Sequence, residues 1–205
     1  MDPLVAVRGF ALGFSIAAVL GPIGVLCIRR TLSSGFLNGF LSGLGAATAD
    51  ATYASIAAFG VTALAALLVD QRTWLRLVGG AFLLYLGVRT LRTAPALRAA
   101  ADVSVRGLVA AYLSTFGLTM SNPMTILSFV AILAGLGLGS MQGELDALAL
   151  VVGVFLGSAA WWLVLASLVS LLRARLTPGV FRVINIGSGV LILAFAGQAW
   201  LSLVA

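Results

Sequence analysis

Long apolar stretches alternate with short polar interruptions along the whole chain. Six apolar runs stand between arginine, proline or acidic residues, at positions 9–28, 35–69, 75–88, 108–139, 145–172 and 183–205. A helix needs roughly 20 apolar residues to cross the hydrocarbon core of a bilayer, so each run predicts one transmembrane helix. The second run is too long for one crossing, and its helix is expected to end near Gly60, with a short continuation to Val69. The pattern predicts an all-α polytopic membrane protein with six transmembrane helices in a single membrane domain, 1–205.

The composition agrees with a membrane protein and excludes several kinds of chemistry. Hydrophobic residues make up 61% of the chain and charged residues 9%, where a soluble domain has about 45–50% and about 25%. The chain has no histidine and one cysteine, Cys27, so His-based catalysis, zinc clusters and an internal disulfide are excluded. We therefore expect no enzyme activity, no cofactor and no metal site. The arginines that give the net charge of +6 lie between apolar runs, which indicates lipid headgroups rather than nucleic acid as the anionic neighbour.

The distribution of arginine predicts which way the helices cross the membrane. Nine arginines lie in the connections that follow the first, third and fifth runs, and only three lie on the other side. Basic residues accumulate in cytoplasmic loops, so the side with nine arginines is predicted to be cytoplasmic and both termini are predicted to lie outside.

The two halves of the chain carry matching motifs. Gly21-Pro22 in the first run corresponds to Asn122-Pro123 in the fourth, and the glycines leading to Gly45 correspond to those leading to Gly157. We expect repeat one at about 1–94 and repeat two at about 105–205, joined by the arginine-rich loop 89–106. Each repeat has three helices, so the second is inserted upside down, an arrangement typical of secondary transporters with broken helices.

Asp50 is the only acid well inside any apolar run. A carboxyl group in a bilayer is costly, so it usually faces a cavity and has a function. Three roles are open: a proton carrier, a Na⁺ ligand, or a counter-charge for a substrate amine; the structural alternative is a hydrogen-bonded acid that holds helices together. Thr48 and Tyr53 are the expected polar neighbours, and Tyr53 shares a helix face with Asp50.

The two prolines are predicted to break the first and fourth helices. A proline inside a helix frees the carbonyl four residues before it, here those of Ala18 and Thr119. We expect the two breaks to face each other across a cavity that binds a polar substrate, although a simple kink is the structural alternative. The candidate binding residues at the breaks are Gly21, Pro22, Asn122 and Pro123.

Two further pairs of residues are candidates for substrate contact. Trp161 and Trp162 lie in the middle of the fifth run, where they would line the cavity and stack on a substrate cation, or else pack against lipid. Arg29 and Arg30 follow Pro22 at the predicted cytoplasmic end, where they set the topology or form a gate that attracts a carboxylate substrate. Cys27 is expected to be a small buried hydrophobe.

The segment 13–30, GFSIAAVLGPIGVLCIRR, and the glycine pattern that runs to Asp50 resemble the start of the lysine exporter (LysE) family and its threonine-homoserine efflux type members. The segment 118–129, LTMSNPMTILSF, resembles that family's fourth-helix motif. The resemblance implies a carrier of the bacterial cytoplasmic membrane that exports amino acids or related small metabolites, driven by an ion gradient. It also implies that the positions at Gly21-Pro22, Asp50 and Asn122-Pro123 form the transport site. Many members read Asn-Pro-Gly-Pro in the first helix where this chain reads Val-Leu-Gly-Pro.

Two other functions were weighed against amino-acid export. A heavy-metal or inorganic-ion carrier of the same superfamily would need soft or acidic ligands in the core, where only Asp50 is available. A transmembrane redox carrier needs a cysteine in each half, and Cys27 has no counterpart near Pro123. Small residues recur every four positions from Gly9 to Gly21, which favours close helix packing and permits a homodimer.

Overall fold

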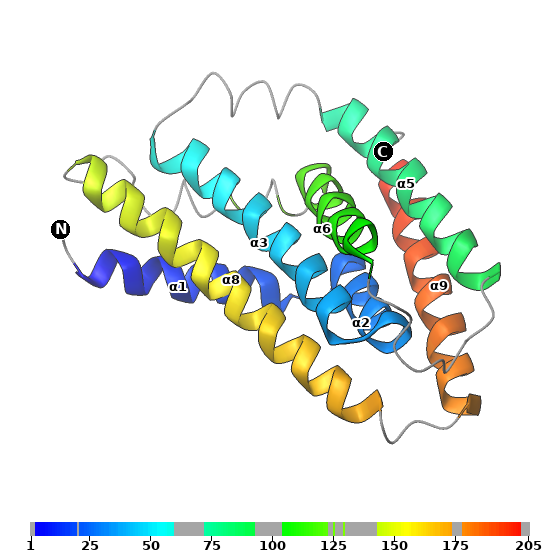
Figure 1. Cartoon of the computed structure of the whole chain (residues 1–205). Coiled ribbons are helices and arrows are strands. Elements are labelled where there is room, and N and C mark those ends of the chain that lie inside the picture. The colour runs from blue at the N-terminus through cyan, green and yellow to red at the C-terminus, as the bar shows by residue number, and fades with distance from the viewer. Residues whose placement is uncertain are drawn as a thin grey trace.

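The computed structural model describes residues 3–19, 21–59, 72–92, 104–122, 125, 129, 143–173 and 178–201. These ranges hold seven helices and no strand, so the all-α class is confirmed (Figure 1). The helices are α1 (Pro3–Ala18), α2 (Pro22–Ser34), α3 (Phe36–Ala58), α5 (Arg72–Arg92), α6 (Val105–Met120), α8 (Glu144–Arg173) and α9 (Pro178–Leu201).

Most helix ends lie close to those predicted from the apolar runs. Helix α8 covers the fifth run, and α3 ends at Ala58, two residues before the predicted end. The first run is different, because α2 continues through Arg29 and Arg30 to Ser34 instead of stopping before them. Arginine is a good helix former, so the two charges do not end the helix. The continuation 60–69, most of the loop 89–106 and most of the second half of the fourth run lie outside the described residues.

The first predicted helix is two helices with a full interruption between them. Helices α1 and α2 are bent by 77° relative to each other. Gly21 is the N-cap of α2 in an extended conformation, with φ −129° and ψ −166°, and Pro22 is the first residue of the helix. A proline costs nothing at this position, because the first N–H of a helix has no intrahelical partner. The predicted break is therefore present, and it redirects the chain instead of kinking one helix.

Only part of the described chain passes a test of length and hydropathy for membrane spans. Helix α8, with 30 residues, is long and apolar enough to cross a membrane alone. The bent pair of α1 and α2 passes the same test when the two helices are taken together as one span. Shorter apolar helices occur within α5, α6 and α9.

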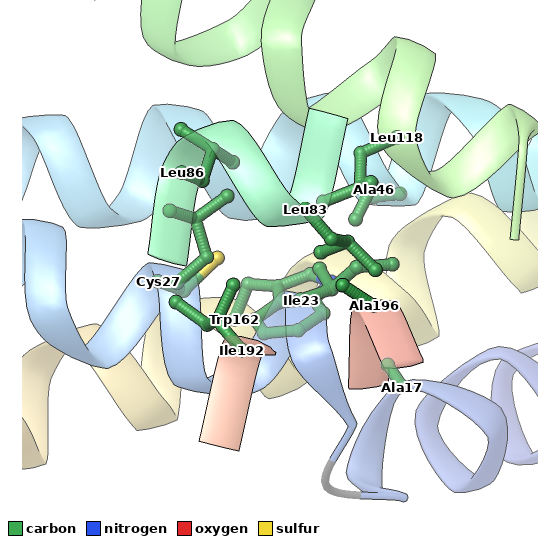
Figure 2. Packing of buried hydrophobic residues seen from close by; sticks show 12 residues of the cluster. Ala17, Ile23, Cys27, Ala46, Leu83, Leu86, Leu118, Trp162, Ile192 and Ala196 are labelled. Atoms are coloured by element: carbon green, nitrogen blue, oxygen red, sulfur yellow. The ribbon is translucent and has the colours of Figure 1, made fainter. Parts of the chain in front are cut away.

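The helices pack in pairs around a shared core. Helix α1 packs on α8, α3 packs on both α8 and α6, and α5 packs on α9 at one side of the molecule (Figure 1). Helix α2 lies between these groups and contacts α3, α8 and α9. The largest core cluster gathers side chains from all seven helices around the indole of Trp162, with Cys27 among them (Figure 2).

Glycines allow the closest of these contacts. A Cβ atom added at Gly9 would lie 2.5 Å from the carbonyl oxygen of Leu150. A Cβ at Gly157 would strike the carbonyl oxygen of Phe10, and one at Gly45 would strike that of Tyr112. Helices α1 and α8, and likewise α3 and α6, therefore meet backbone to backbone, and no larger residue fits at these positions without separating them.

We predict that Gly157→Ala lowers the stability of the protein in detergent. The new methyl group has to push α1 and α8 apart, and overpacking of this kind costs about 1–3 kcal/mol. The midpoint of thermal unfolding, measured by the loss of monodisperse protein on heating, should fall by at least about 2 °C.

Gly197→Ala in α9 is the matched control, because no atom of the described residues lies within 4 Å of a Cβ added there. This variant should keep or slightly raise the midpoint, since alanine is the better helix former. Equal losses in both variants would contradict the packing argument.

Candidate functional site

A cavity of about 50 Å³ lies where the α1–α2 break, the end of α6 and the middle of α3 and α8 come together. This is room for a few water-sized groups. Most of the wall is apolar, and the polar groups converge from different helices. The lining residues are Ile16, Ala17, Val19, Gly21, Pro22, Ile23, Gly24, Ala46, Asp50, Thr119, Asn122, Thr125 and Trp162.

Among the described residues of this wall Asp50 is the only carboxylate, and it is 3% exposed. Its oxygen accepts a hydrogen bond of 2.8 Å from the hydroxyl of Ser158 on α8. Ser158 in turn accepts a hydrogen bond of 3.2 Å from the indole nitrogen of Trp162, one turn further along α8. Within the described ranges no arginine forms an ion pair with Asp50. The carboxylate is therefore held between two helices by a neutral donor.

Ser158 is the site residue that the sequence reasoning missed. It is fully buried, and it is the direct contact between Asp50 and α8. The available signal was its place directly after Gly157, within a pattern that matches the one before Asp50 in the first half. Gly157 lets α8 approach α1 closely, and the next residue then points its hydroxyl at α3.

The end of α6 shows how the second break is arranged. The carbonyl of Thr119, predicted to be freed by Pro123, accepts the backbone N–H of Asn122 at 3.1 Å. The helix tightens in its last turn, so this carbonyl has a backbone partner of its own. The side-chain amide of Asn122 donates to Thr125 at 3.0 Å. Pro123 itself lies outside the described residues.

Thr48 and Tyr53 connect α3 to α6 and are not part of the cavity wall. The hydroxyl of Tyr112 donates to Thr48 at 2.9 Å. The hydroxyl of the buried Tyr53 donates to the carbonyl oxygen of Met120 at 2.6 Å, at the last residue of α6. A carbonyl at a helix end inside a membrane needs such a partner. The two residues fix α6 beside Asp50.

The two adjacent tryptophans have different surroundings. Trp162 is buried and lines the cavity. Trp161 packs edge-on against Phe14 of α1, with ring centroids 5.4 Å apart and an interplanar angle of 82°. The indole nitrogen of Trp161 is buried and has no hydrogen-bond partner in the described part of the chain. The structure thus brings Trp162 to the site and turns Trp161 toward α1.

Arg30 lies near the cavity without lining it. Its guanidinium donates to four neutral acceptors on α3 and α6 at 2.7–2.9 Å. Three of the acceptors share the two N–H groups of one terminal nitrogen, so one N–H is bifurcated. The acceptors are the hydroxyls of Ser42, Ser114 and Thr115 and the carbonyl oxygen of Ala111. Arg29 is half-buried beside it on α2.

A bundle of apolar helices with a buried acid in a cavity beside a helix break is the arrangement expected of a polytopic carrier. The chain matches the family described as LysE type translocator over residues 14–202, and it belongs to that family. It is therefore a membrane transporter and not an enzyme.

Similar proteins come from several bacteria. The chain is 35% identical over 198 residues to the chemotactic transduction protein ChpE of Pseudomonas aeruginosa, covering 93% of each chain. It is 31% identical over 192 residues to the putative amino acid efflux protein YcgF of Bacillus subtilis, covering 90% of this chain and 89% of YcgF. It is 29% identical over 209 residues to the uncharacterized membrane protein YahN of Escherichia coli, covering 96% of this chain and 89% of YahN. No solved structure matches the chain.

We predict that Asp50 and Ser158 are energetically coupled. Ser158→Ala leaves the carboxyl of Asp50 and the indole N–H of Trp162 without their partner, which should cost about 1–3 kcal/mol of stability. In a double-mutant cycle with Asp50→Ala, which removes the acceptor, the coupling energy from thermal unfolding in detergent should be at least about 0.5 kcal/mol.

Ser55→Ala is the matched control on α3. The Ser55 hydroxyl donates to the carbonyl of Ala51 in its own helix and makes no bond to α8. A cycle of Ser55→Ala with Asp50→Ala should be additive. Additivity in the Ser158 cycle as well would show that the hydrogen bond has no energetic role.

Proposed function

We propose that this protein is a secondary active transporter that exports amino acids or related small metabolites from the cytoplasm, coupled to H⁺ or Na⁺ through Asp50. The observation that carries the proposal is the burial of Asp50 as the sole carboxylate among the described residues that line the cavity beside the α1–α2 break. Membership of the LysE type translocator family and the similarity to a putative amino acid efflux protein of Bacillus subtilis support the substrate class.

The surroundings of Asp50 suit a group that changes its charge during transport. The hydroxyl of Ser158 can donate to an ionised carboxylate, and it can also accept from a protonated one. With no arginine paired to Asp50 in the described ranges, the charge can be neutralised by a proton, a Na⁺ ion or a substrate ammonium group. Each of these binds on one side of the membrane and leaves on the other.

No observation favours the alternative of a heavy-metal or inorganic-ion carrier. Such a site needs several oxygen, nitrogen or sulfur ligands in one place. Among the residues that the structure describes, no three Asp, Glu, Cys or His side chains come together.

We also propose that residues about 1–94 and about 105–205 form two inverted repeats. In such an arrangement α1 corresponds to α6, α3 to α8 and α5 to α9. The contact between α1 and α8 then corresponds to the contact between α6 and α3, and both contacts occur. The closest approaches in these contacts also correspond. The Cβ of a residue at Gly157 would strike the carbonyl of Phe10, and at the equivalent Gly45 it would strike the carbonyl of Tyr112.

Aromatic pairs at equivalent positions support the same exchange. Phe10 and Phe14 stack on α1 with ring centroids 6.3 Å apart, and Tyr112 and Phe116 stack on α6 with centroids 6.5 Å apart. Position 10 is equivalent to 112 and position 14 to 116, which is the same alignment that relates the two glycine contacts. It is shifted by one residue from the alignment that pairs Pro22 with Pro123.

The cavity lies between equivalent residues of the two repeats. Ala17 of α1 and Thr119 of α6 are equivalent, as are Asp50 of α3 and Trp162 of α8, and all four line the cavity. A site near the axis that relates two inverted repeats is the expected place for substrate in a secondary transporter. Only the first repeat has an acid at this position, because the equivalent of Asp50 in the second repeat is Trp162.

We predict that Asp50→Asn abolishes export that depends on an ion gradient. The full-length protein would be reconstituted into vesicles loaded with labelled amino acids, and efflux would be followed under an imposed pH or Na⁺ gradient. Gradient-dependent efflux should fall to less than about a tenth of wild type, because losing about 1.4 kcal/mol of stabilisation already changes a rate tenfold.

Glu144→Gln is the control for a change of charge on the protein. Glu144 is exposed at the start of α8, far along the helix from Ser158, so efflux should be unchanged. Equal gradient-dependent efflux from Asp50→Asn and wild type would remove Asp50 from the coupling mechanism.

The predicted orientation in the bacterial inner membrane has a direct test. Alkaline phosphatase is active only outside the cytoplasm, and a green fluorescent protein folds inside it. With both termini outside, phosphatase fused after Ala205 should be active and the fluorescent fusion at the same position should be dark. The opposite result would overturn the orientation derived from the arginines.

A further inference from the structure

We propose that the guanidinium of Arg30 is the cytoplasmic recognition site for the substrate carboxylate, and that it holds α2 against α3 and α6 until a carboxylate replaces its neutral acceptors. This inference rests on the proposed function, and it names the chemical group that identifies the substrate. Four observations carry it: the acceptors of Arg30, its place beside the cavity, the charge around it, and its absence from the second repeat.

The acceptors of Arg30 are neutral and already have hydrogen-bond partners of their own. The hydroxyl of Ser42 donates to the carbonyl of Asn38 at 2.7 Å, and that of Thr115 donates to the carbonyl of Ala111 at 2.9 Å. Only their lone pairs therefore face the guanidinium. A carboxylate accepts more strongly than a hydroxyl and matches the planar fork of arginine with two parallel bonds. Such a ligand can compete for the donors that now hold the helices together.

In α2, α3 and α6 the residues of the Arg30 contact lie on the same side of the cavity. Ser42 precedes the cavity residue Ala46 by one turn of α3, and Thr115 precedes the cavity residue Thr119 by one turn of α6. Arg30 itself lies two turns beyond the part of α2 that lines the cavity. In all three helices this direction leads toward the end that the arginine distribution predicts to be cytoplasmic. The Arg30 contact therefore stands between that end and the cavity.

The charge at this end of the molecule favours an anion. Arg29 and Arg30 on α2 interact electrostatically with each other and with Arg89 on α5. Three positive charges in one region attract a carboxylate and raise its local concentration.

The positions that the repeat exchange relates to this contact carry no arginine and no hydroxyl side chain in the sequence. The positions equivalent to Ser42, Ser114 and Thr115 are Val154, Leu12 and Gly13, and those equivalent to Arg30 in the sequence are the apolar residues at 131 and 132. Gly13 contacts the backbone of Val154 directly. At this position α1 and α8 therefore pack against each other, whereas at the related position Arg30 lies between α3 and α6. The guanidinium thus serves one side of the membrane only, as recognition of a cytoplasmic substrate requires.

Cys27 provides a reporter for this contact. It is the only cysteine of the chain, it lies on α2 one turn before Arg30, and its side chain is 3% exposed. Alkylation by N-ethylmaleimide, followed by intact mass of the full-length protein in phosphatidylcholine vesicles, therefore measures how often α2 separates from its neighbours.

We expect Arg30→Gln to speed alkylation of Cys27 by at least about tenfold, because losing even one hydrogen bond to a charged group changes an opening equilibrium by that factor. Thr115→Val, which keeps the shape of the side chain and removes one acceptor, should speed alkylation as well. Arg106→Gln, an exposed arginine at the start of α6, should leave the rate unchanged. Wild-type rates in both Arg30→Gln and Thr115→Val would overturn the proposal.

Recognition of the carboxylate is tested with matched probes. An equimolar mixture of the neutral L-amino acids should speed alkylation of the wild type and of Thr115→Val, while the same mixture as carboxamides should not. Neither mixture should change the rate in Arg30→Gln. An equal effect of acids and amides, or an effect that persists in Arg30→Gln, would contradict a carboxylate site at Arg30.

The two proposals fail in different ways. If amino-acid export is wrong, wild-type vesicles release no labelled amino acid, whatever the alkylation rates. If only the Arg30 proposal is wrong, the wild type exports amino acids and Cys27 responds alike to acids and amides.

Discussion

The hydrogen bond between Asp50 and Ser158 is the interaction on which the centre of this structure depends. A carboxylate in an apolar bundle needs a partner, and α3 can find one only if α8 comes close. The glycines of α1 and α8 bring this about, since Gly157 lies against the backbone of Phe10 and directs the next residue toward α3. Trp162 then completes the chain of donors and closes the wall of the cavity. The close packing of α1 on α8 and the geometry of the site at Asp50 therefore depend on each other.

Much of the fold could be predicted because hydropathy is a local property. The apolar runs located the described helices, and the pair Gly21-Pro22 located the first break, since both signals act within a few residues. The sequence could also single out Asp50, because an acid in an apolar run is conspicuous in one dimension. Ser158 escaped notice because a serine is ordinary in a membrane helix and acquires its role only from a residue 108 positions away.

The same limit explains the differences at Trp161, Thr48 and Tyr53. Spacing along a helix gives the face of a side chain, but the neighbour of that face is set by how the helices are arranged. Trp161 faces α1 while Trp162 faces the cavity, although they are adjacent in the sequence. Thr48 and Tyr53 were expected as polar neighbours of Asp50, and the structure shows them hydrogen-bonded to α6 at Tyr112 and Met120. These bonds hold the second break beside the first.

The bend between α1 and α2 forms a hinge point at Gly21 for rotation of α2. Gly21 separates the two helices, so α2 can turn about this point without bending its own hydrogen bonds. Arg30 lies eight residues from Pro22, about 12 Å along the axis, so a rotation of about 5° moves it by about 1 Å. That displacement takes hydrogen bonds of 2.7–2.9 Å beyond the range in which they hold. A rotation too small to alter the outline of the molecule is therefore enough to break the hydrogen bonds that tie α2 to α3 and α6.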